Sequence, residues 1–351
     1  MSVKVAATHE MGKLEPRKVF CDTLIEMAKE DDRVCVLDAD LMGAAGTKPF
    51  QTAFPERTFD CGVQEANMIG VAGGLSSRGF IPFAHTFGIF AARRACDQIF
   101  LAGAYARQNI KVVGSDPGIT AGLNGGTHMP FEDLGIMTTI PGLTVVEPCD
   151  AVAVGKVTRL AKENYGTWYM RLVRKEAAVV YEEGTDFTVG KANLLRDGSD
   201  VTIIAIGYMV AEALKAAEML EKEGISARVL DMWCLKPLDE EAVIAAAKET
   251  GCIVTAENHS VKNGLGSAVA SCLALNRPTA IEMVGVQDEF GEVAKTPELA
   301  GRFKLTADEI AAKARKAVAR KAHKHTWARI SDDLATAISE LHSFTDDVFS
   351  F

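Results

Sequence analysis

A carboxylate, a glycine-rich helix and two phenylalanines follow one another in the segment FDCGVQEANMIGVAGGLSSRGFIPFAHTFGIF. Glu65 stands at the predicted start of the helix, where the helix dipole stabilises a negative charge. Phe87 and Phe90 are one turn apart on the helix that we expect after a strand ending near Phe83. A carboxylate beside two rings suits either an ordinary hydrophobic core or a site that stacks and hydrogen-bonds a planar heteroaromatic ring.

Three glycines interrupt the first of these helices. Gly70, Gly73 and Gly74 lie in its interior, although an interior glycine costs a helix about 1 kcal/mol relative to alanine. Glycines at this spacing leave one helix face flat, so that another backbone can approach closely. The flat face can pack against the sheet of this chain or against a helix of a partner subunit, and the sequence leaves both interpretations open.

Two further glycine-rich segments contain candidate ligand-binding groups. His128 lies in GGTHMP, directly after the run GLNGG, and a histidine in such a loop rarely belongs to a core. The run NGLGS, at 263–267, has no ribose-binding acid in the context of a dinucleotide loop. We interpret GLNGG and NGLGS as turns, the second one leading into a helix.

Alternating strand and helix patterns predict the elements that position these groups. Four strands are predicted in the first half, Val34–Leu37, Ile110–Gly114, Leu143–Val146 and Trp168–Leu172. A second alternating unit begins at Val201, after a turn-rich stretch that reads as a linker with a short hairpin. The expected fold is therefore α/β, with two parallel-sheet domains at 1–185 and 186–322 and a short helical tail at 323–351.

Composition and charge limit the class of protein. The chain has 351 residues, 48% of them hydrophobic, and a formal net charge of -9. An acidic protein repels phosphodiester backbones and anionic lipids, so neither nucleic acid nor a membrane is an expected partner. No apolar run reaches the ~20 residues of a membrane span, and the first residues lack the apolar core of a signal peptide. We expect a cytoplasmic protein.

Several motifs in order resemble one enzyme family. The pyrimidine-binding half of transketolases is similar to GVQEANMIGVAGGL, PFAHTFGIFAARRACDQI and GGTHMPFEDLGIMTTIPGLTVVEPCDA. The family's C-terminal domain resembles the region containing VTIIAIGYMVAEALKAAEML and VTAENHSVKNGLGSAVA, and WYMRLVRK joins the two parts. The resemblance covers roughly Arg17 to Lys321. It implies a thiamine diphosphate pyrimidine-binding fold followed by a transketolase C-terminal-like domain.

One family motif is missing from the sequence. Transketolases hold the diphosphate and its metal with a GDG motif and a later asparagine, and no GDG occurs here. The resemblance therefore implies the C-terminal subunit of a split transketolase, without metal ligands of its own. A partner subunit would hold the diphosphate and Mg²⁺ or Ca²⁺, in an expected A2B2 heterotetramer. This transferase of carbohydrate metabolism would move a two-carbon ketol unit from a ketose, including a modified sugar, to an aldose.

The resemblance assigns two groups of residues to the cofactor and the reaction. Glu65 matches the glutamate that hydrogen-bonds the aminopyrimidine in a water-poor site and promotes deprotonation of the thiazolium carbon. His128 matches a substrate-facing histidine. The other cofactor-binding positions are Phe90 as the principal stacking ring, Phe87 beside it, Asp40, Leu41 and Arg93. Asp40 and Leu41 suit an ordinary strand end equally well, and Arg93 can contact the pyrimidine or point to solvent.

The resemblance also assigns substrate-binding positions, some of which depart from the family. Arg17 and Arg174 match two phosphate-binding arginines, with Arg171 close by. Asp116 stands where the family has a histidine, and Asn124 replaces an aspartate that reads hydroxyl stereochemistry. His85 takes the place of a small hydroxylated residue and can reach substrate or cap a helix. A carboxylate at 116 opposes a phosphate, so the usual pentose phosphate specificity is not expected.

Two alternatives remain open at this stage. The beta subunit of a 2-oxoacid dehydrogenase decarboxylase component shares the two-domain design, but THMPFEDL and the paired Arg17 and Arg174 argue against it. A noncatalytic scaffold subunit that has lost its cofactor site is the other alternative. The presence of Glu65, Phe90 and His128 argues against the scaffold.

Overall fold

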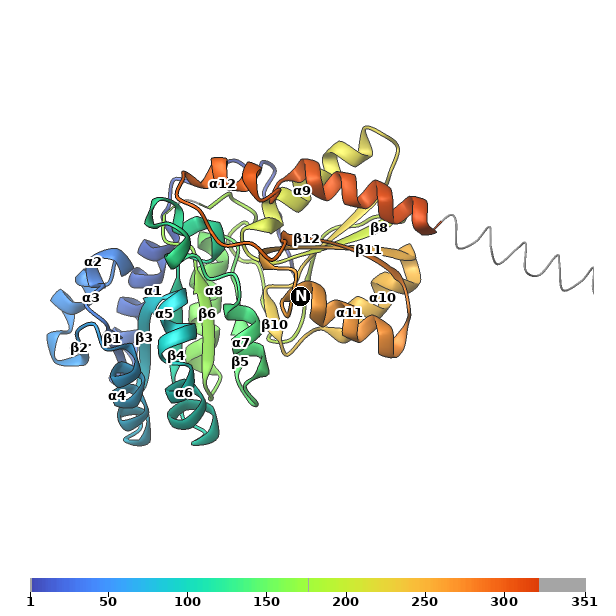
Figure 1. Cartoon of the computed structure of the whole chain (residues 1–351). Helices are drawn as coiled ribbons and strands as arrows, with labels where there is room; N and C mark the ends of the chain where they lie inside the picture. Colours follow the sequence, from blue (N-terminus) through green and yellow to red (C-terminus); the bar gives the residue numbers. More distant parts are fainter. Residues whose placement is uncertain (1, 176, 322–351) are drawn as a thin grey trace, which may run out of the picture.

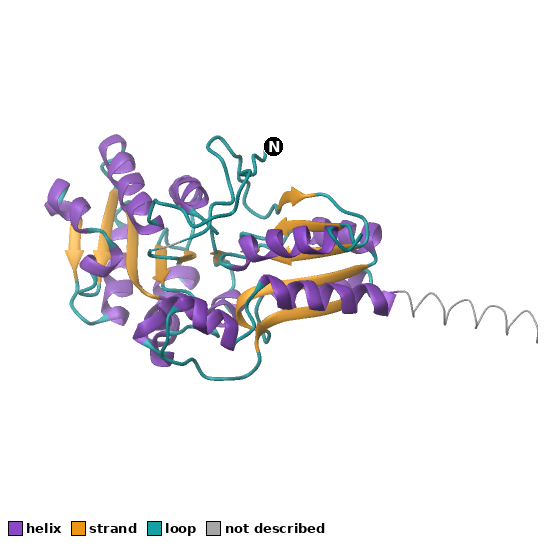
Figure 2. Cartoon of the chain, turned by 90° about the horizontal axis from the view of Figure 1, so that it is seen from above, coloured by secondary structure: helices purple, strands orange, loops and turns teal. Residues whose placement is uncertain are grey.

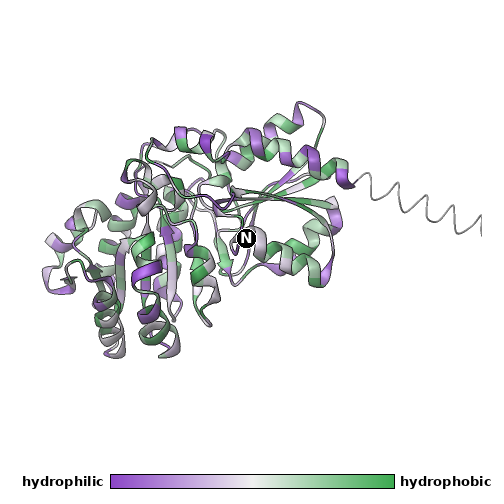
Figure 3. Cartoon of the chain, in the orientation of Figure 1, coloured by the Kyte–Doolittle hydropathy of each residue, from purple (hydrophilic) through white to green (hydrophobic). Residues whose placement is uncertain are grey.

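The computed structural model describes residues 2–175 and 177–321, which form two α/β lobes lying side by side (Figure 1). The predicted tail at 323–351 lies outside the described residues. Each lobe is a sheet with helices packed on its faces, and the view from above separates the two groups of strands (Figure 2). Hydrophobic residues concentrate on the strands and on the inner sides of the helices (Figure 3).

The first lobe has a seven-stranded sheet in the order β10-β5-β6-β4-β3-β1-β2. Its strands are β1 (Val34–Asp38), β2 (Thr58–Asp60), β3 (Ile81–Phe87), β4 (Lys111–Ser115), β5 (Thr144–Val146), β6 (Trp168–Leu172) and β10 (Cys234–Lys236). All neighbouring pairs are parallel except the antiparallel pair of β10 with β5. The central strands are buried on both faces, as parallel strands covered by helices are.

The helices of the first lobe vary in length. The longer ones are α1 (Pro16–Glu30), α4 (Glu65–Ser77), α5 (Gly88–Arg94), α7 (Asp133–Thr139) and α8 (Ala151–Glu163). The shorter α-helices are α2 (Met42–Ala45), α3 (Lys48–Ala53) and α6 (Cys96–Gln98), followed by a π-helical segment, Ile99–Tyr105. Three 3₁₀ turns complete the lobe, Pro55–Arg57, Gly118–Asn124 and Gly126–His128.

The second lobe has a five-stranded sheet in the order β12-β11-β8-β9-β7. Its strands are β7 (Asn193–Arg196), β8 (Val201–Ala205), β9 (Ala227–Asp231), β11 (Cys252–Ser260) and β12 (Ala280–Val286). Its helices are α9 (Met209–Glu221), α10 (Glu240–Thr250), α11 (Leu265–Asn276) and α12 (Thr296–Arg302), and a final helix at 307–321. The hairpin predicted in the linker is wrong, because β7 pairs antiparallel with β9 as an edge strand.

The two lobes are joined by more than the linker. Strand β10 follows β9 in the chain but pairs with β5 of the first sheet. Helix α12 packs on the Gly118–Asn124 turn of the first lobe, and Figure 1 shows the orange-red segment reaching over that lobe. Residues of the second lobe are therefore placed to hold the loops that carry the candidate site.

The candidate site lies at the carboxyl ends of β1, β3 and β4. The chain runs from β1 to β2 on one side of the sheet and from β3 to β4 on the other, so the connections diverge between β1 and β3. Ligands of open α/β sheets bind in the crevice at such a topological switch point. Glu65, at the start of α4, and Asp116, directly after β4, both lie next to this edge of the sheet.

Candidate active site

Three rings form the aromatic part of the site. The ring centroids of Phe87 and Phe90 are 5.8 Å apart, and that of His128 lies 5.9 Å from Phe87 and 5.3 Å from Phe90. The imidazole is edge-on to both rings. The loop with His128 is held against the second lobe, because a Cβ added to Gly126 would lie 2.0 Å from the carbonyl oxygen of Gly291. The structure thus brings these three predicted residues together.

The backbone at Phe87 differs from the expectation. The sequence predicts Phe87 on a helix with Phe90, but it is the last residue of β3 and the N-cap position of α5. Strand β3 runs four residues beyond Phe83, its expected end. The two phenylalanines still meet, because the chain turns directly from strand to helix at Gly88.

Glu65 lies beside the aromatic rings and is almost fully buried, with 4% of its surface exposed. Its carboxylate Oε1 accepts a hydrogen bond of 2.9 Å from Nη1 of Arg94. The guanidinium of Arg94 also lies over the ring of Phe90, 3.9 Å from its centroid. Glu65 and Phe90 therefore face a common space, as an acid that hydrogen-bonds a stacked ring must.

Arg94 takes the place that the sequence suggested for Arg93. The guanidinium of Arg93 pairs with Glu132 and does not contact Glu65. Sequence reasoning missed Arg94, although it lies four residues after Phe90 and such pairs share a helix face. We therefore leave Arg93 out of the proposed site.

A buried ion pair lies on the other side of Phe87. Arg174 binds Asp116 in a bidentate manner, with Nε to Oδ1 at 2.6 Å and Nη2 to Oδ2 at 2.5 Å. Its guanidinium is 5.0 Å from the centroid of Phe87. Burial raises the pKa of Asp116 above its usual value, against the opposite effect of Arg174. The carboxylate of Asp116 thus neutralises one of the two predicted anion-binding arginines.

The second predicted arginine lies next to the first. The backbone N–H of Arg17 donates to the carbonyl of Arg174 at 3.3 Å. Its side chain donates to the carbonyl of Ala44 at 3.1 Å and to Glu15 at 2.9 Å, and it remains partly exposed. Arg17 and Arg174 thus form one cationic corner, shared with Asp116.

His85 and Asp38 form a buried pair at the switch point. The imidazole Nδ1 is 3.2 Å from a carboxylate oxygen of Asp38, and the other ring nitrogen, Nε2, is buried without a hydrogen-bond partner among the described residues. His85 is part of β3, so its expected alternative as a helix cap is wrong. An unpartnered buried nitrogen is a group that a bound ligand or water can satisfy.

Asp40 and Leu41 follow β1 at the rim of the same crevice. The backbone N–H of Leu41 donates to Asp38, and that of Asp40 donates to Asp60 at 3.0 Å. Asp40 is exposed and has a positive φ of 60°, which fixes a sharp turn after the strand. The structure places both residues near the site without deciding between their two interpretations.

Two predicted substrate-binding residues have different surroundings. Asn124 is exposed at the end of the Gly118–Asn124 turn. Arg171 is wrongly predicted, because its side chain is fully buried and donates hydrogen bonds to Asp133 and Glu147. Its guanidinium is consumed by this internal network, so we assign it a structural role.

The second lobe contributes a motif that sequence reasoning left without a role, the ENHS run that ends β11. The side chain of Asn258 accepts from the N–H of Ile119 at 2.9 Å and donates to the carbonyl of Pro117 at 2.9 Å. It thereby fixes the loop that follows Asp116. At Gly118, φ is +50° and an added Cβ would lie 2.1 Å from Asn258, so only glycine fits there.

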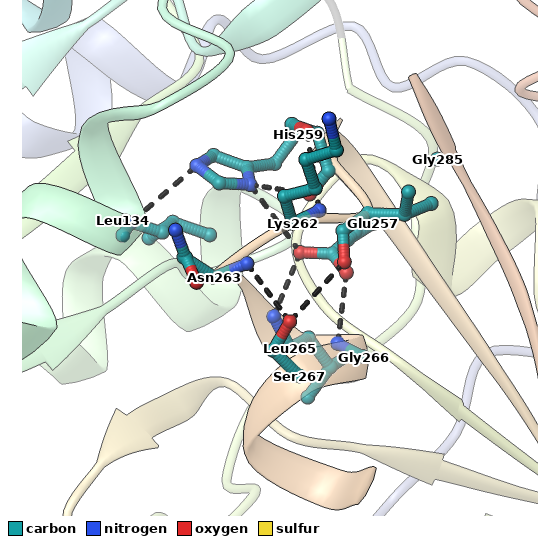
Figure 4. Close-up of polar contacts among 12 residues, drawn as sticks. Leu134, Glu257, His259, Lys262, Asn263, Leu265, Gly266, Ser267 and Gly285 are labelled. Carbon is teal, nitrogen blue, oxygen red and sulfur yellow. Dashed lines mark hydrogen bonds and ion pairs between the residues drawn. The ribbon is translucent and has the colours of Figure 1, made fainter. Parts of the chain in front are cut away.

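The neighbours of Asn258 fix the start of α11 (Figure 4). The carboxylate of Glu257 accepts hydrogen bonds from the N–H groups of Leu265 at 2.7 Å and Gly266 at 2.8 Å. His259 Nδ1 lies 3.6 Å from the same carboxylate, and Figure 4 shows its ring directed toward Leu134 in the first lobe. The run NGLGS therefore forms the turn into a helix that the sequence predicts.

The site fits one end of a thiamine cofactor. A buried carboxylate beside exposed ring surface suits an aminopyrimidine, and the unpartnered Nε2 of His85 leaves one polar group for a ligand. Among residues 2–175 and 177–321 no group of three or more His, Cys, Asp or Glu residues could hold a metal ion. In the same ranges no helix is long and apolar enough to cross a membrane.

Comparisons with family models define the class of this protein. The model of the transketolase pyrimidine binding domain matches residues 12–178, and that of the transketolase C-terminal domain matches residues 190–310. The chain belongs to the transketolase family. The expected α/β fold of two such domains is confirmed.

Individual relatives narrow the class. The 6-deoxy-6-sulfo-D-fructose transketolase subunit SqwH of Clostridium sp. (strain MSTE9) is 53% identical over 87% of this chain and 95% of its own. An apulose-4-phosphate transketolase subunit of Phocaeicola vulgatus is 36% identical over 84% of this chain and 93–94% of its own length, 94% as aligned. A solved structure described as a split gene transketolase, inactive beta4 tetramer, is 42% identical, with a TM-score of 0.82 over 88% of this chain and 100% of that one. The chain is a subunit of a split, thiamine diphosphate-dependent transketolase.

Proposed function

We propose that this chain supplies the pyrimidine end of the cofactor site. Thiamine diphosphate, when bound, supplies the nucleophilic carbon that accepts the two-carbon unit. Glu65 would hydrogen-bond the pyrimidine ring nitrogen and exchange a proton with it. Phe90 would stack on the ring and Phe87 would support Phe90. The observation that carries this proposal is the shared space between the buried Glu65 carboxylate and the ring of Phe90.

The partner subunit would complete the site. We place the diphosphate and Mg²⁺ or Ca²⁺ on that subunit, because this sequence has no GDG motif. The inactive tetramer described for the 42% identical split transketolase supports the need for a second chain. We propose an A2B2 heterotetramer in the cytoplasm, and mass measurement of the purified complex by light scattering tests this stoichiometry. A stable one-to-one complex with full activity would exclude it.

His128 would bind the donor sugar beside the cofactor. Its imidazole is half-buried between the two phenylalanines and the loop, and Oγ1 of Thr127 lies 3.0 Å from Nδ1. This contact leaves Nε2 for the first hydroxyl and the carbonyl of a ketose. Asn124, exposed near the same loop, would contact the hydroxyl groups further along the donor.

We propose that the donor is a modified ketose with a monoanionic or uncharged end. Asp116 neutralises Arg174, so the cationic corner carries less net positive charge than two free arginines. A phosphate monoester carries about -1.5 to -2 at pH 7, whereas a sulfonate carries one negative charge. The name of the 53% identical relative, which specifies a 6-deoxy-6-sulfo-D-fructose transketolase, supports a sulfonated ketose as the first donor to try.

A donor panel on the reconstituted enzyme tests this specificity. The panel compares kcat/KM for xylulose 5-phosphate, fructose 6-phosphate, 6-deoxy-6-sulfofructose and an unphosphorylated ketose, with one aldose acceptor throughout. We expect a donor without a phosphate group to give the highest kcat/KM. A preference for xylulose 5-phosphate over every modified ketose would refute the proposed role of Asp116.

A further inference from the structure

Arg94 makes the two contacts that the cofactor ring requires. One guanidinium hydrogen-bonds the Glu65 carboxylate at 2.9 Å and lies 3.9 Å from the centroid of Phe90. A pyrimidine held by the same two side chains needs the same carboxylate oxygen region and a face of the same ring. Because one planar group satisfies both partners at once, it fills the space between them.

The surroundings of Arg94 allow it to move. Its side chain is 50% exposed, whereas the side chain of Glu65 is 4% exposed. The arginine thus reaches inward from the surface toward a fixed, buried partner. It lies in the last turn of α5, so a change in its side-chain torsions can withdraw the guanidinium without disturbing the sheet.

We propose that Arg94 is a placeholder for the cofactor: in the chain without its partner, it occupies the position of the pyrimidine ring and must be displaced when the cofactor binds. The inference rests on the proposed role of Glu65 and Phe90. Arg94 keeps the buried carboxylate paired and Phe90 covered while no ligand is present. A buried charge left without a partner costs free energy, and this arrangement avoids that cost in the isolated subunit.

The placeholder lowers the affinity of the isolated chain for the pyrimidine. When the binding-competent state is only a fraction of the population, the apparent dissociation constant rises by the inverse of that fraction. A half-exposed ion pair and a cation–π contact are each worth up to ~1 kcal/mol. Removal of Arg94 should therefore strengthen binding by about tenfold.

The neighbouring arginine provides a matched control. Arg93 is 51% exposed and also pairs with a glutamate, Glu132, but that contact lies away from Glu65. Thiamine carries a positive charge, so loss of any nearby cation could favour its binding. Arg93→Ala removes the same charge from the adjacent position and isolates the general electrostatic effect from the displacement.

The experiment titrates thiamine, which lacks the diphosphate, into the full isolated chain by calorimetry. We expect Arg94→Ala to lower the dissociation constant about tenfold relative to wild type, and Arg93→Ala to leave it within about twofold. The double variant Glu65→Gln, Arg94→Ala should lose the gain, because the carboxylate that receives the ring is gone. Thermal unfolding of each variant verifies that it is folded.

Unchanged or weaker binding of thiamine to Arg94→Ala would overturn the proposal, as would the absence of measurable binding at millimolar ligand. An equal gain in Arg93→Ala would also overturn it. A failure of the cofactor assignment has a different signature. In that case the wild-type complex with its partner would bind no thiamine diphosphate, whichever residue stands at position 94.

Discussion

The environment of Glu65 determines what this residue can contribute to the reaction. Its carboxylate is buried at the start of α4, beside Phe90, and is reached from the surface by Arg94. A buried carboxylate can hold or release a proton toward a bound ring without competition from bulk water. The effect of a mutation here should therefore appear in turnover and leave the fold intact.

Glu65→Gln in the reconstituted enzyme tests this role. The amide keeps size and polarity but cannot exchange a proton with the pyrimidine nitrogen. We expect kcat to fall by ~10² to 10⁴-fold, the usual contribution of general acid–base catalysis. Steady-state kinetics at saturating thiamine diphosphate measures the change, and wild-type turnover in this variant would exclude Glu65 as the activating acid.

Asp116→His tests the role of the buried ion pair in donor choice. The position has a positive φ of 60°, which histidine tolerates better than most residues. The imidazole would free Arg174 and add a hydrogen-bond donor, so kcat/KM for phosphorylated donors should rise by about 10 to 100-fold, or ~1.5 to 3 kcal/mol.

Asp116→Asn is the control for this substitution. It removes the charge at a similar size, and asparagine also tolerates positive φ. Its donor preference should shift in the same direction but less far. If neither variant gains activity with phosphorylated donors, the carboxylate does not select against phosphate.

Among the secondary-structure elements, β11 and α11 show how the second lobe supports the site. The end of β11 supplies Glu257, which caps α11, and Asn258, which holds the loop after Asp116. Both residues are fully buried. A change in the charge of Glu257 should therefore alter the stability of the fold.

The pH dependence of stability tests the environment of Glu257. Burial raises its pKa from 4.5 to about 7, although the N–H groups of Gly266 and Leu265 act in the opposite direction. Between these two pH values the folded protein keeps the proton and the unfolded chain has lost it. This group's contribution to the free energy of unfolding is therefore fully present below about pH 4.5 and declines as the pH rises toward 7.

Glu257→Gln removes this contribution. Relative to wild type, the variant should gain as much as ~3 kcal/mol in unfolding free energy between pH 4.5 and pH 7. Urea titrations at several pH values measure the difference, and the other buried acids cancel because both proteins contain them. Parallel pH profiles for the two proteins would contradict the assigned pKa.

The sequence predicted most central elements because their physical signals are local. Trp168–Leu172 is a strand with the predicted bounds, and Cys252 begins β11 as expected, since buried β-branched runs mark such strands. The edge strands β2, β7 and β10 are three or four residues long and give no periodic signal. The pairing of β10 with the first sheet is a tertiary feature that no local pattern contains.

The candidate site was predictable only where a motif fixed the backbone. Phe90, Phe87 and His128 meet as the resemblance implies. The roles of Arg94 and Arg171 were not predictable, because they depend on which way a long flexible side chain turns. Arg171 turns inward to Asp133, and this choice is determined by three-dimensional packing.

For the whole molecule, the central claim is that the chain is one half of an active site. It contains the two domains of a transketolase that carry the pyrimidine and C-terminal parts. No residue set for the diphosphate and its metal is present among the described residues. Activity should therefore depend on the second chain and saturate when the two are present in equal numbers.

The most direct test measures ketol transfer by the purified chain alone and during titration with its partner, at fixed thiamine diphosphate and Mg²⁺. We expect no transfer by the chain alone and a linear rise in activity that ends at one partner per chain. Arg93→Ala should follow the same curve as wild type. Sustained magnesium-dependent ketol transfer by the pure chain, without any partner, would contradict the account.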